Sequence, residues 1–229
     1  AGFCNETAFV WSVTLDLREG MHSAEIQIRD GAGFLTVYSW TFTIDTRAPS
    51  LEVTSPTMSL TNEADVIVAG VTDLDASVTV NGVSVSVNTT TGAFSTPVTL
   101  AEGPNVLTVV ASDAAGNTAT VVKTVVLDTV PPALAITSPA SGAPVAAVVH
   151  VVGTAEVGAS LTVNGVSVSV GSTGAWSVDL AFAHGGHTIT ATATDAAGNT
   201  ATVTRDLSLD TTAPVVTVTA PADGLTTNH

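Results

Sequence analysis

The chain repeats its own sequence at an interval of about 82 residues, and this repetition constrains its fold more than any single motif. Ile189–Val203 restates Leu107–Val121, and the phrase Val-Asn-Gly-Val-Ser-Val-Ser-Val occurs at 80–87 and again at 163–170. A third motif, Asp-Thr-x-x-Pro, closes three successive units, at Asp45–Pro49, Asp128–Pro132 and Asp210–Pro214. Repeats of this length are typical of modular arrays. Such arrays usually extend, space or bind, so the repetition favours a non-catalytic role.

The interval divides the chain into four segments. Residues 49–131 and 132–213 are each expected to form one complete unit of the array. Residues 1–48 align with the C-terminal half of a unit, because Trp11–Pro49 matches Trp176–Pro214 without a gap. Residues 214–229 resemble the first strand of a further unit, and the alternative is that Pro214–His229 is a strand donated to another copy of the chain.

The third unit has the alternation of apolar and polar residues that predicts short β-strands. Asn164-Gly165 separates two alternating runs, and Asn81-Gly82 does the same in the second unit. Asn-Gly predicts a tight hairpin because both residues tolerate positive φ. The seven expected strands are Ala133–Thr137, Ala146–Val152, Ser160–Val163, Val166–Val170, Trp176–Leu180, His187–Thr194 and Thr200–Leu209.

Seven short strands in about 82 residues predict an all-β fold of tandem immunoglobulin-like β-sandwiches. Because the units follow one another with short Pro-containing linkers, we expect them to form an elongated rod. Trp176, Phe94 and Trp11 occupy equivalent positions and are expected to fill the core between the two sheets.

Composition excludes several classes of function. Lys and Arg number 5 against 20 Asp and Glu, for a formal charge of −15, which disfavours nucleic acid and anionic membranes as partners. No apolar run is long enough to cross a bilayer. Cys4 is the single cysteine, so an intrachain disulfide is impossible, as in many secreted bacterial modules. An extracellular or cell-surface location is therefore expected.

Several phrases resemble the tandem bacterial Ig-like modules of large surface adhesins and of spacers in secreted polysaccharide-degrading enzymes. The matching phrases are Gly174-Ala175-Trp176, Glu102-Gly103-Pro104-Asn105, the loops Asp113–Asn117 and Asp195–Asn199, and the Asp-Thr-x-x-Pro linkers. The resemblance implies a secreted, non-catalytic structural module. In the first unit, Asp30-Gly31-Ala32-Gly33-Phe34 departs from the pattern because it lacks the asparagine.

Acidic residues predict a metal site at each junction between units. In an Ig-like sandwich, two loops of one unit and the linker from the preceding unit meet at one pole, and oxygen ligands at this density suit Ca²⁺. The resemblance supports Ca²⁺, since some adhesin arrays of this kind are stiffened by calcium. The candidate ligands are Asp45, Asp73, Asp75, Asp113 and Asn117 at one junction, Asp128, Glu156, Asp195 and Asn199 at the next, and Asp210 in the third linker.

A simpler interpretation of the same residues needs no metal. Asp113 and Asp195 are suited to cap a turn in which Gly116 or Gly198 adopts positive φ. Asp128 is equally suited to cap backbone amides ahead of proline. The two interpretations remain open at the level of sequence.

Other candidate features do not recur between units, which favours structural roles for them. His184-Gly185-Gly186-His187 is expected to be a turn rather than a metal pair. Lys123 is a candidate for an intramolecular isopeptide bond, although Arg205 and Trp40 stand at its equivalent positions. Asn5 and Asn88 begin glycosylation sequons. No arrangement of nucleophile, base and acid is preserved by the repeat, so we expect no enzyme.

These observations predict a structural segment of an extracellular fibre or adhesin stalk. Its partners would be its neighbouring repeats, other copies of the chain in a filament, and a glycan or surface receptor. The alternative is a spacer or carbohydrate-binding module of a secreted polysaccharide-degrading enzyme. Tyr38 and Trp40 share one face of a predicted strand, and their exposure would favour sugar stacking.

Overall fold

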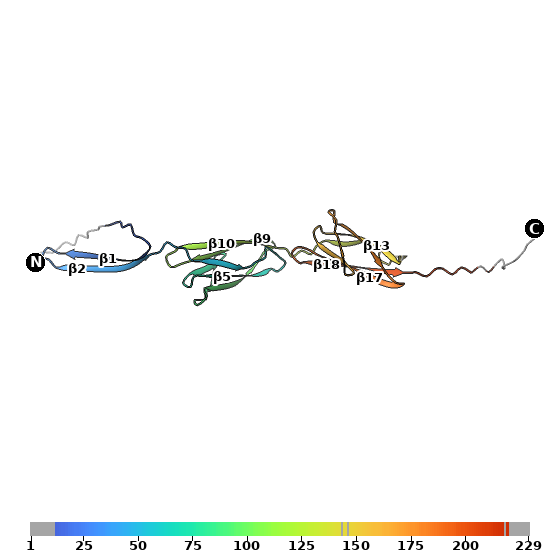
Figure 1. Cartoon of the computed structure of the whole chain (residues 1–229), viewed down its shortest axis with the longest axis horizontal. Coiled ribbons are helices and arrows are strands. Elements are labelled where there is room, and N and C mark those ends of the chain that lie inside the picture. The colour runs from blue at the N-terminus through green and yellow to red at the C-terminus, as the bar shows by residue number, and fades with distance from the viewer. Residues whose placement is uncertain (1–11, 143, 146, 218, 220–229) are drawn as a thin grey trace, which may run out of the picture. The chain divides into compact units, whose positions relative to one another are not determined.

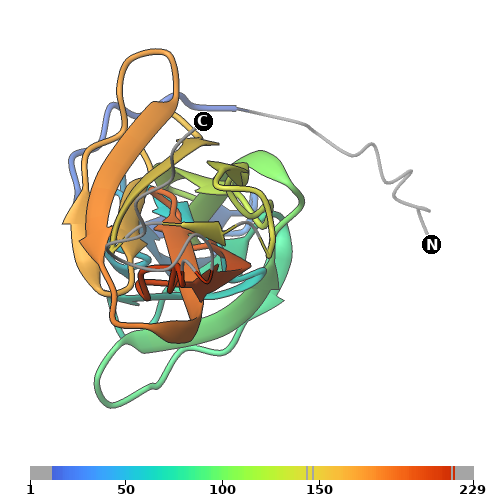
Figure 2. The same cartoon turned by 90° about the vertical axis from the view of Figure 1, so that its right-hand side faces the viewer.

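The computed structural model describes residues 12–142, 144–145, 147–217 and 219, and all regular elements among them are β-strands (Figures 1 and 2). No helix in this part of the chain is long and apolar enough to span a membrane. The chain divides into two compact units. One takes in the described residues up to Thr57 with Val66–Val98 and Val106–Thr124, and the other takes in Met58–Asp65, Thr99–Asn105 and the described residues from Val125 onward.

The third repeat lies within the second unit and is built from two sheets. The larger sheet has the order β12-β18-β17-β14-β15, and the smaller has the order β11-β13-β16. Neighbouring strands are antiparallel except β12, which pairs in parallel with β18. The bounds are β11 Leu134–Ser138, β12 Pro144–Val145, β13 Val148–Ala155, β14 Ser160–Val163, β15 Val166–Val168, β16 Ala175–Ala181, β17 Gly185–Thr194 and β18 Thr200–Leu209.

The second repeat has the same two-sheet topology, in the orders β4-β10-β9-β6-β7 and β3-β5-β8. Each strand matches one of the third repeat at the interval seen in the sequence. The bounds are β3 Leu51–Ser55, β4 Leu60–Thr61, β5 Asp65–Thr72, β6 Ser77–Val80, β7 Val83–Val85, β8 Ala93–Thr99, β9 Gly103–Ser112 and β10 Thr118–Leu127. The all-β, tandem Ig-like fold predicted from the sequence is therefore confirmed.

The first repeat contributes a single hairpin to the described structure. Strands β1 (Gly20–Arg29) and β2 (Leu35–Ile44) pair antiparallel from end to end, with Gly20 opposite Ile44. They match β17 and β18 of the third repeat position by position. Trp11, expected to fill the core of this repeat, lies outside the described residues.

The Asn-Gly hairpins form as the sequence predicts. Asn81 and Asn164 have φ of 49° and 47°, and Gly82 and Gly165 each have φ of 80°. Positive φ at both central residues is the requirement of a type I′ turn, whose twist matches that of the flanking strands. Each asparagine also accepts a hydrogen bond at its Oδ1 from the neighbouring strand of the sheet. The donors are Thr108 N of β9 at 2.9 Å and Thr190 N of β17 at 2.8 Å.

Most of the expected strands of the third repeat agree with the structure to within one or two residues, and two differ more. The expected run Ala146–Val152 falls on β13 (Val148–Ala155), and the short strand β12 (Pro144–Val145), which joins the other sheet just before it, was not predicted. The expected strand Val166–Val170 ends at Val168, where β15 loses its pairing with β14. Period-two alternation marks which residues are extended, but it carries no information about which sheet they join.

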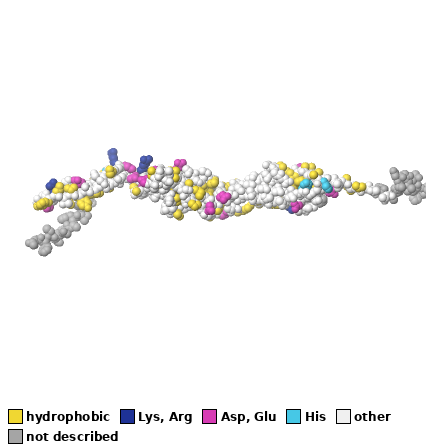
Figure 3. Space-filling view, turned by 90° about the horizontal axis from the view of Figure 1, so that it is seen from below, with side chains coloured by type: hydrophobic (Ala, Val, Ile, Leu, Met, Phe, Trp, Pro, Cys, Tyr) yellow, Lys and Arg dark blue, Asp and Glu magenta, His cyan; other side chains and the backbone are white. Residues whose placement is uncertain are grey.

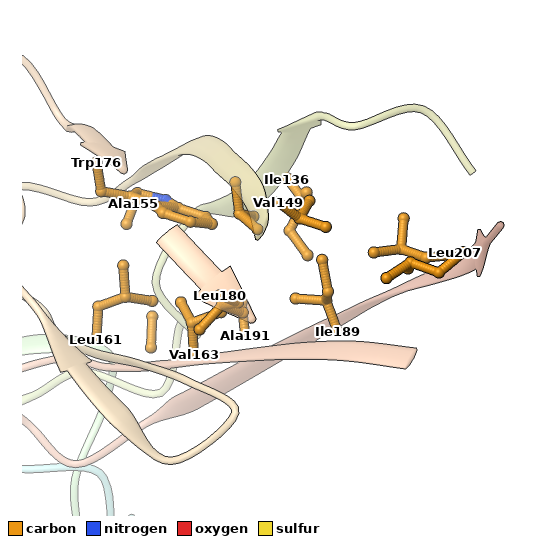
Figure 4. Close-up of a cluster of buried hydrophobic side chains, with 13 residues drawn as sticks. Ile136, Val149, Ala155, Leu161, Val163, Trp176, Leu180, Ile189, Ala191 and Leu207 are labelled. Atoms are coloured by element: carbon orange, nitrogen blue, oxygen red, sulfur yellow. The ribbon is translucent and has the colours of Figure 1, made fainter. Parts of the chain in front are cut away.

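An aromatic ring lies on a glycine in each complete core. Figure 4 shows the core of the third repeat with Trp176. Trp176 is 3% exposed within a cluster that includes Ile136, Val151, Leu161 and Ile189. The indole covers Gly153 so closely that a Cβ on this residue would overlap the ring and the carbonyl oxygen of Ala135. In the second repeat the ring of Phe94 covers Gly70 in the same way, so the core role predicted for Trp176 and Phe94 is confirmed.

Charged side chains are sparse on the surface. In the face shown in Figure 3, most of the described surface is neither acidic, basic nor hydrophobic. This pattern follows from the composition, in which only 11% of the residues are charged while threonine and serine alternate outward along the strands. Exposed hydroxyl groups keep a sheet face hydrated without the long basic side chains that bind phosphate.

Candidate functional site at the linkers

The recurring polar residues of the chain gather at its Asp-Thr-x-x-Pro linkers. In each linker the aspartate accepts a hydrogen bond at Oδ1 from the backbone N–H two residues later. The donors are Arg47 at 3.0 Å, Val130 at 3.1 Å and Thr212 at 2.9 Å. This is an Asx turn, which holds the backbone in one conformation ahead of the proline. The sequence prediction that Asp128 caps a backbone amide is thus confirmed.

The threonine of the linker binds back to the repeat that precedes it. We call the turn directly before β1, β9 or β17 the corner turn. In the first repeat, Glu19 of the corner turn accepts hydrogen bonds from Thr46, at 3.3 Å from its N–H and 2.6 Å from its hydroxyl. In the second repeat, Glu102 accepts the equivalent pair from Thr129, at 3.3 and 2.9 Å. The bonds from Thr46 are the main cause that lowers the pKa of Glu19 below its ordinary value.

An asparagine of the following repeat binds the same linker from the other side. Asn117 donates from Nδ2 to the carbonyl oxygen of Asp45 at 3.1 Å, and Asn199 donates to that of Asp128 at 2.7 Å. The first contact lies within the first compact unit of the chain, and the second lies within the second unit. Pro49 and Pro132, which close these two linkers, are buried. The linker is therefore bound by the repeat before it and by the repeat after it.

The carboxylate of the same loop positions that asparagine. Asp113 accepts hydrogen bonds from the N–H and the side chain of Asn117, each at 2.9 Å. Asp195 accepts the same two bonds from Asn199, also at 2.9 Å, and a third from Gly198 N at 2.8 Å. Gly116 and Gly198 have φ of 92° and 98°. Each aspartate thus caps a turn with a positive-φ glycine, as the simpler interpretation of these residues expected.

These bonds change the acidity of both loop carboxylates. The hydrogen bond from the Asn117 side chain is the main cause that lowers the pKa of Asp113. For Asp195, desolvation raises the pKa, but the bonds from Asn199, Gly198 and Ala197 together outweigh it and leave the pKa lowered. Each loop is thus more stable with its carboxylate ionised.

The remaining acidic candidates lie near the first linker, except Glu156, which lies in a loop of the third repeat. Asp45, Asp73, Asp75 and Asp113 line a polar hollow of about 430 Å³ together with Glu19 and Arg47. Asp73 accepts hydrogen bonds from the hydroxyl and the N–H of Ser50, and these lower its pKa. Glu156 lies at the equivalent loop of the third repeat, where its backbone N–H binds Ala133 O at 2.9 Å.

The donor set fits hydrogen bonding better than it fits a cation. The oxygens of Asp113 and Asp195 already accept N–H donors, and the guanidinium of Arg47 lines the hollow that the other carboxylates share. Among the described residues, no group of three or more His, Cys, Asp or Glu side chains is arranged to hold a metal ion. A Ca²⁺ ion, which takes six to eight oxygens, would compete with these N–H donors for the lone pairs of Asp113 and Asp195.

We expect the third repeat to lose stability in acid through Asp195. Its pKa is lower in the fold than the ordinary 3.8, so its contribution is present above that value and is lost as the pH falls through it. The thermal midpoint, followed by Trp176 fluorescence, should fall most steeply below about pH 4. Asp195→Asn should flatten that fall, and an unchanged acid slope in this variant would contradict the assignment.

Tyr38 and Trp40 are exposed, at 71% and 43%, which is the condition the sugar-stacking alternative required. Their positions argue for a different origin of that exposure. Together with Phe42 they occupy the face of β2 that matches Val203, Arg205 and Leu207 of β18, the face turned toward the core of the third repeat. Among the described residues the first repeat has no second sheet to cover this face. The aromatic side chains are therefore equivalent to core positions rather than to a surface platform.

The other candidate residues have structural contacts. His184 lies in the corner turn before β17, but Gly185–His187 already belong to β17, so the turn expected over His184–His187 includes only its first residue. His187 Nε2 lies 2.9 Å from Ala183 O. Lys123 donates from Nζ to Pro56 O at 2.9 Å. Asn88 caps its own turn through Thr90 N and Thr91 N. Cys4 and Asn5 lie outside the described residues.

Sequence reasoning missed half of the linker contacts. It selected the aspartates and asparagines as metal ligands, and it left out Glu19, Glu102 and the linker threonines. The missed signal was the recurrence of Thr in every Asp-Thr-x-x-Pro motif, at a fixed interval from a glutamate in two of three repeats.

The family model of glucodextranase domain B matches the chain twice, over residues 49–129 and 132–211. The two matches cover more than half of the chain and coincide with the two complete sandwiches. The chain therefore belongs to the glucodextranase domain B family and consists of tandem Ig-like modules. The comparison with curated proteins finds no match.

The chain is also similar to solved structures of other modular proteins. Fibronectin(III)-like modules of CbhA from Clostridium thermocellum are 16% identical, over 70% of this chain and 94% of theirs, with a TM-score of 0.44. A 1.5-MDa bacterial ice-binding adhesin is 24% identical, over 84% and 76%, with a TM-score of 0.38. A tetra-tandem repeat from the extending region of a large adhesion protein is 22% identical, over 85% and 57%, with a TM-score of 0.33. The family assignment rests on the family model.

Proposed function

We propose that the chain is a non-catalytic structural segment of an extracellular surface fibre or adhesin stalk, whose linkers are locked by hydrogen bonds. The observation that carries this proposal is the contact of each of the first two linkers with both flanking repeats. Glu19 and Asn117 bind the linker at Thr46 and Asp45, and the second linker repeats this pattern. A linker bound on both sides limits bending between neighbours, as nearest-neighbour contacts do in other arrays.

The proposed role makes the chain an extended, monodisperse spacer. Small-angle X-ray scattering of the purified chain tests this directly, because an array with locked linkers gives the cross-section of a rod and a fixed maximum dimension. A scattering curve of a flexible chain of beads would contradict the proposal.

Calcium at the junctions is the other candidate for a stiffening device. The hollow lined by Asp45, Asp73 and Asp75 supports it, and the hydrogen bonds already made by Asp113 and Asp195 weigh against it. We expect that removing divalent cations with EGTA leaves the thermal midpoint and the scattering curve unchanged. A midpoint that falls with EGTA and recovers with added Ca²⁺, but not Mg²⁺, would restore the calcium hypothesis.

A spacer or carbohydrate-binding module of a secreted polysaccharide-degrading enzyme is the second candidate function. The family name favours it, since it is taken from a domain of a glucodextranase. The exposed Tyr38 and Trp40 support sugar binding only if their face stays uncovered in the whole protein. Titration of glucans against the intrinsic fluorescence separates the two roles: quenching that Trp40→Ala abolishes supports binding, and no response leaves the spacer role.

Assembly of copies into a filament is the remaining part of the proposal. Its support is the exposed apolar face of β1 and β2, together with Val215 and Val216, which are also exposed. Light scattering at increasing protein concentration tests it, because a filament-forming chain shows a mass that grows with concentration.

A further inference from the structure

The third linker differs from the first two at one position of the lock. Where Glu19 and Glu102 accept hydrogen bonds from the linker threonine, the corner turn of the third repeat carries His184. Its Nδ1 accepts the N–H of Thr211 at 3.3 Å. The N–H of the linker threonine is bound in all three repeats, but the acceptor is a carboxylate in two of them and an imidazole nitrogen in the third, and the hydroxyl bonds of Thr46 and Thr129 to their glutamates have no counterpart at His184.

The two kinds of acceptor respond differently to pH. A carboxylate stays ionised, and therefore remains an acceptor, throughout the neutral range. An imidazole nitrogen accepts a hydrogen bond only while it carries no proton, and histidine side chains change charge between about pH 5 and 8. Protonation of His184 would place an N–H group against the N–H of Thr211, so this contact would be lost.

The surrounding charges do not replace the lost contact. Asp210 of the linker lies 3.8 Å from His184 Nδ1, and both side chains are largely exposed, so their attraction is weak. Asp210 also remains bound to Thr212 N. On β18, Asp206 accepts a bond from Thr188 at 2.7 Å.

His187, the other titratable group of this turn, keeps its role when charged. Its Nε2 faces the carbonyl oxygen of Ala183 at 2.9 Å, and its ring packs on Phe182. A carbonyl needs a donor, and imidazolium supplies one. The first repeat uses His22 in the same way, with Arg18 O at 2.6 Å. Protonation therefore removes one contact of the turn, the one between His184 and Thr211.

We propose that the third linker is a pH-sensitive joint, in which protonation of His184 releases Thr211 while the first two linkers stay locked. This inference rests on the proposed function, in which hydrogen bonds between the corner turn and the linker threonine hold the linker in place. It gives the array one position whose flexibility changes between neutral and mildly acidic surroundings.

Amide exchange of the linker threonines, measured by NMR on the full chain and corrected for the intrinsic rate at each pH, tests the joint. Between pH 7.5 and 5, the protection of Thr211 should fall by about two- to tenfold, the range expected for the loss of one ordinary hydrogen bond. The protection of Thr129 should not change. His184→Glu should remove the fall at Thr211, and the reciprocal Glu102→His should introduce it at Thr129.

The outcomes separate the joint from the lock itself. If Thr129 is protected and Thr211 shows no fall, or if the fall persists in His184→Glu, the pH-sensitive joint is wrong and the lock stands. If Thr46 and Thr129 are unprotected at every pH, the linker lock and the proposed function fail together.

Discussion

Gly153→Ala should unfold the third repeat at a temperature about 10–20 °C below that of the unmodified chain, while the second repeat keeps its own transition. The methyl group would overlap the indole of Trp176 and the carbonyl oxygen of Ala135. Neither can retreat, because Trp176 is enclosed by the core and Ala135 is paired with Thr154 in the β11–β13 ladder. Overpacking of this kind costs about 3 kcal/mol or more when backbone is involved.

The same repeat offers a matched control for this substitution. A Cβ on Gly186 would meet no atom within 4 Å, and this residue does not have positive φ. Gly186→Ala should therefore leave the midpoint within about 2 °C. Calorimetry that resolves the two repeats, with Trp176 fluorescence as the local probe, measures both variants. Equal midpoints for Gly153→Ala and Gly186→Ala would show that the ring does not lie on Gly153.

Asn199→Ala should destabilise the third repeat and free its linker at the same time. The side chain is only 9% exposed, and its amide connects Asp128 O to the carboxylate of Asp195. Removing it leaves both acceptors without this donor, at a cost of about 1–3 kcal/mol, or roughly 5–15 °C in the midpoint of a repeat of this size. Thermal unfolding of the variant measures the effect.

The neighbouring substitution Thr200→Ala is the control that distinguishes loss of the Asn199 hydrogen bonds from a general effect of changing this loop. Thr200 is exposed and takes no part in the contacts with Asp128 and Asp195, so its replacement should leave the midpoint unchanged. Asn117→Ala should act on the linker at Asp45 and spare the third repeat. If Asn199→Ala and Thr200→Ala behave alike, the amide contributes nothing to the junction.

Most of the strands could be predicted because their chemistry is local. Period-two alternation marked β14 and β18 with their observed bounds, and Asn164-Gly165 fixed the hairpin between β14 and β15. The end of β15 and the division between β12 and β13 depend on which sheet each residue joins. That choice is made by contacts distant in sequence, so alternation alone does not contain it.

The sequence located the residues that gather at the junctions, but not the hydrogen bonds that they make. The recurrence of Asp113 and Asp195 pointed correctly to the junctions between repeats. The number of carboxylate and amide oxygens at each junction suggested a cation site. A sequence does not reveal that Asn117 and Asn199 direct their amide N–H groups at the carboxylates. The pairing of Glu102 with Thr129 spans 27 residues and becomes visible only when the corner turn and the linker are folded together.

The central claim is that each of the first two linkers is fixed by the repeat before it and the repeat after it. Pulsed electron–electron resonance between spin labels at Ser84→Cys and Ser172→Cys, in a Cys4→Ser background, reports the spread of distances across the second linker. Both labelled positions are exposed. We predict one narrow distance distribution in the parent chain and a broad one when Glu102→Ala and Asn199→Ala are combined. A distribution that is already broad in the parent, or equally narrow in the double variant, would contradict the lock.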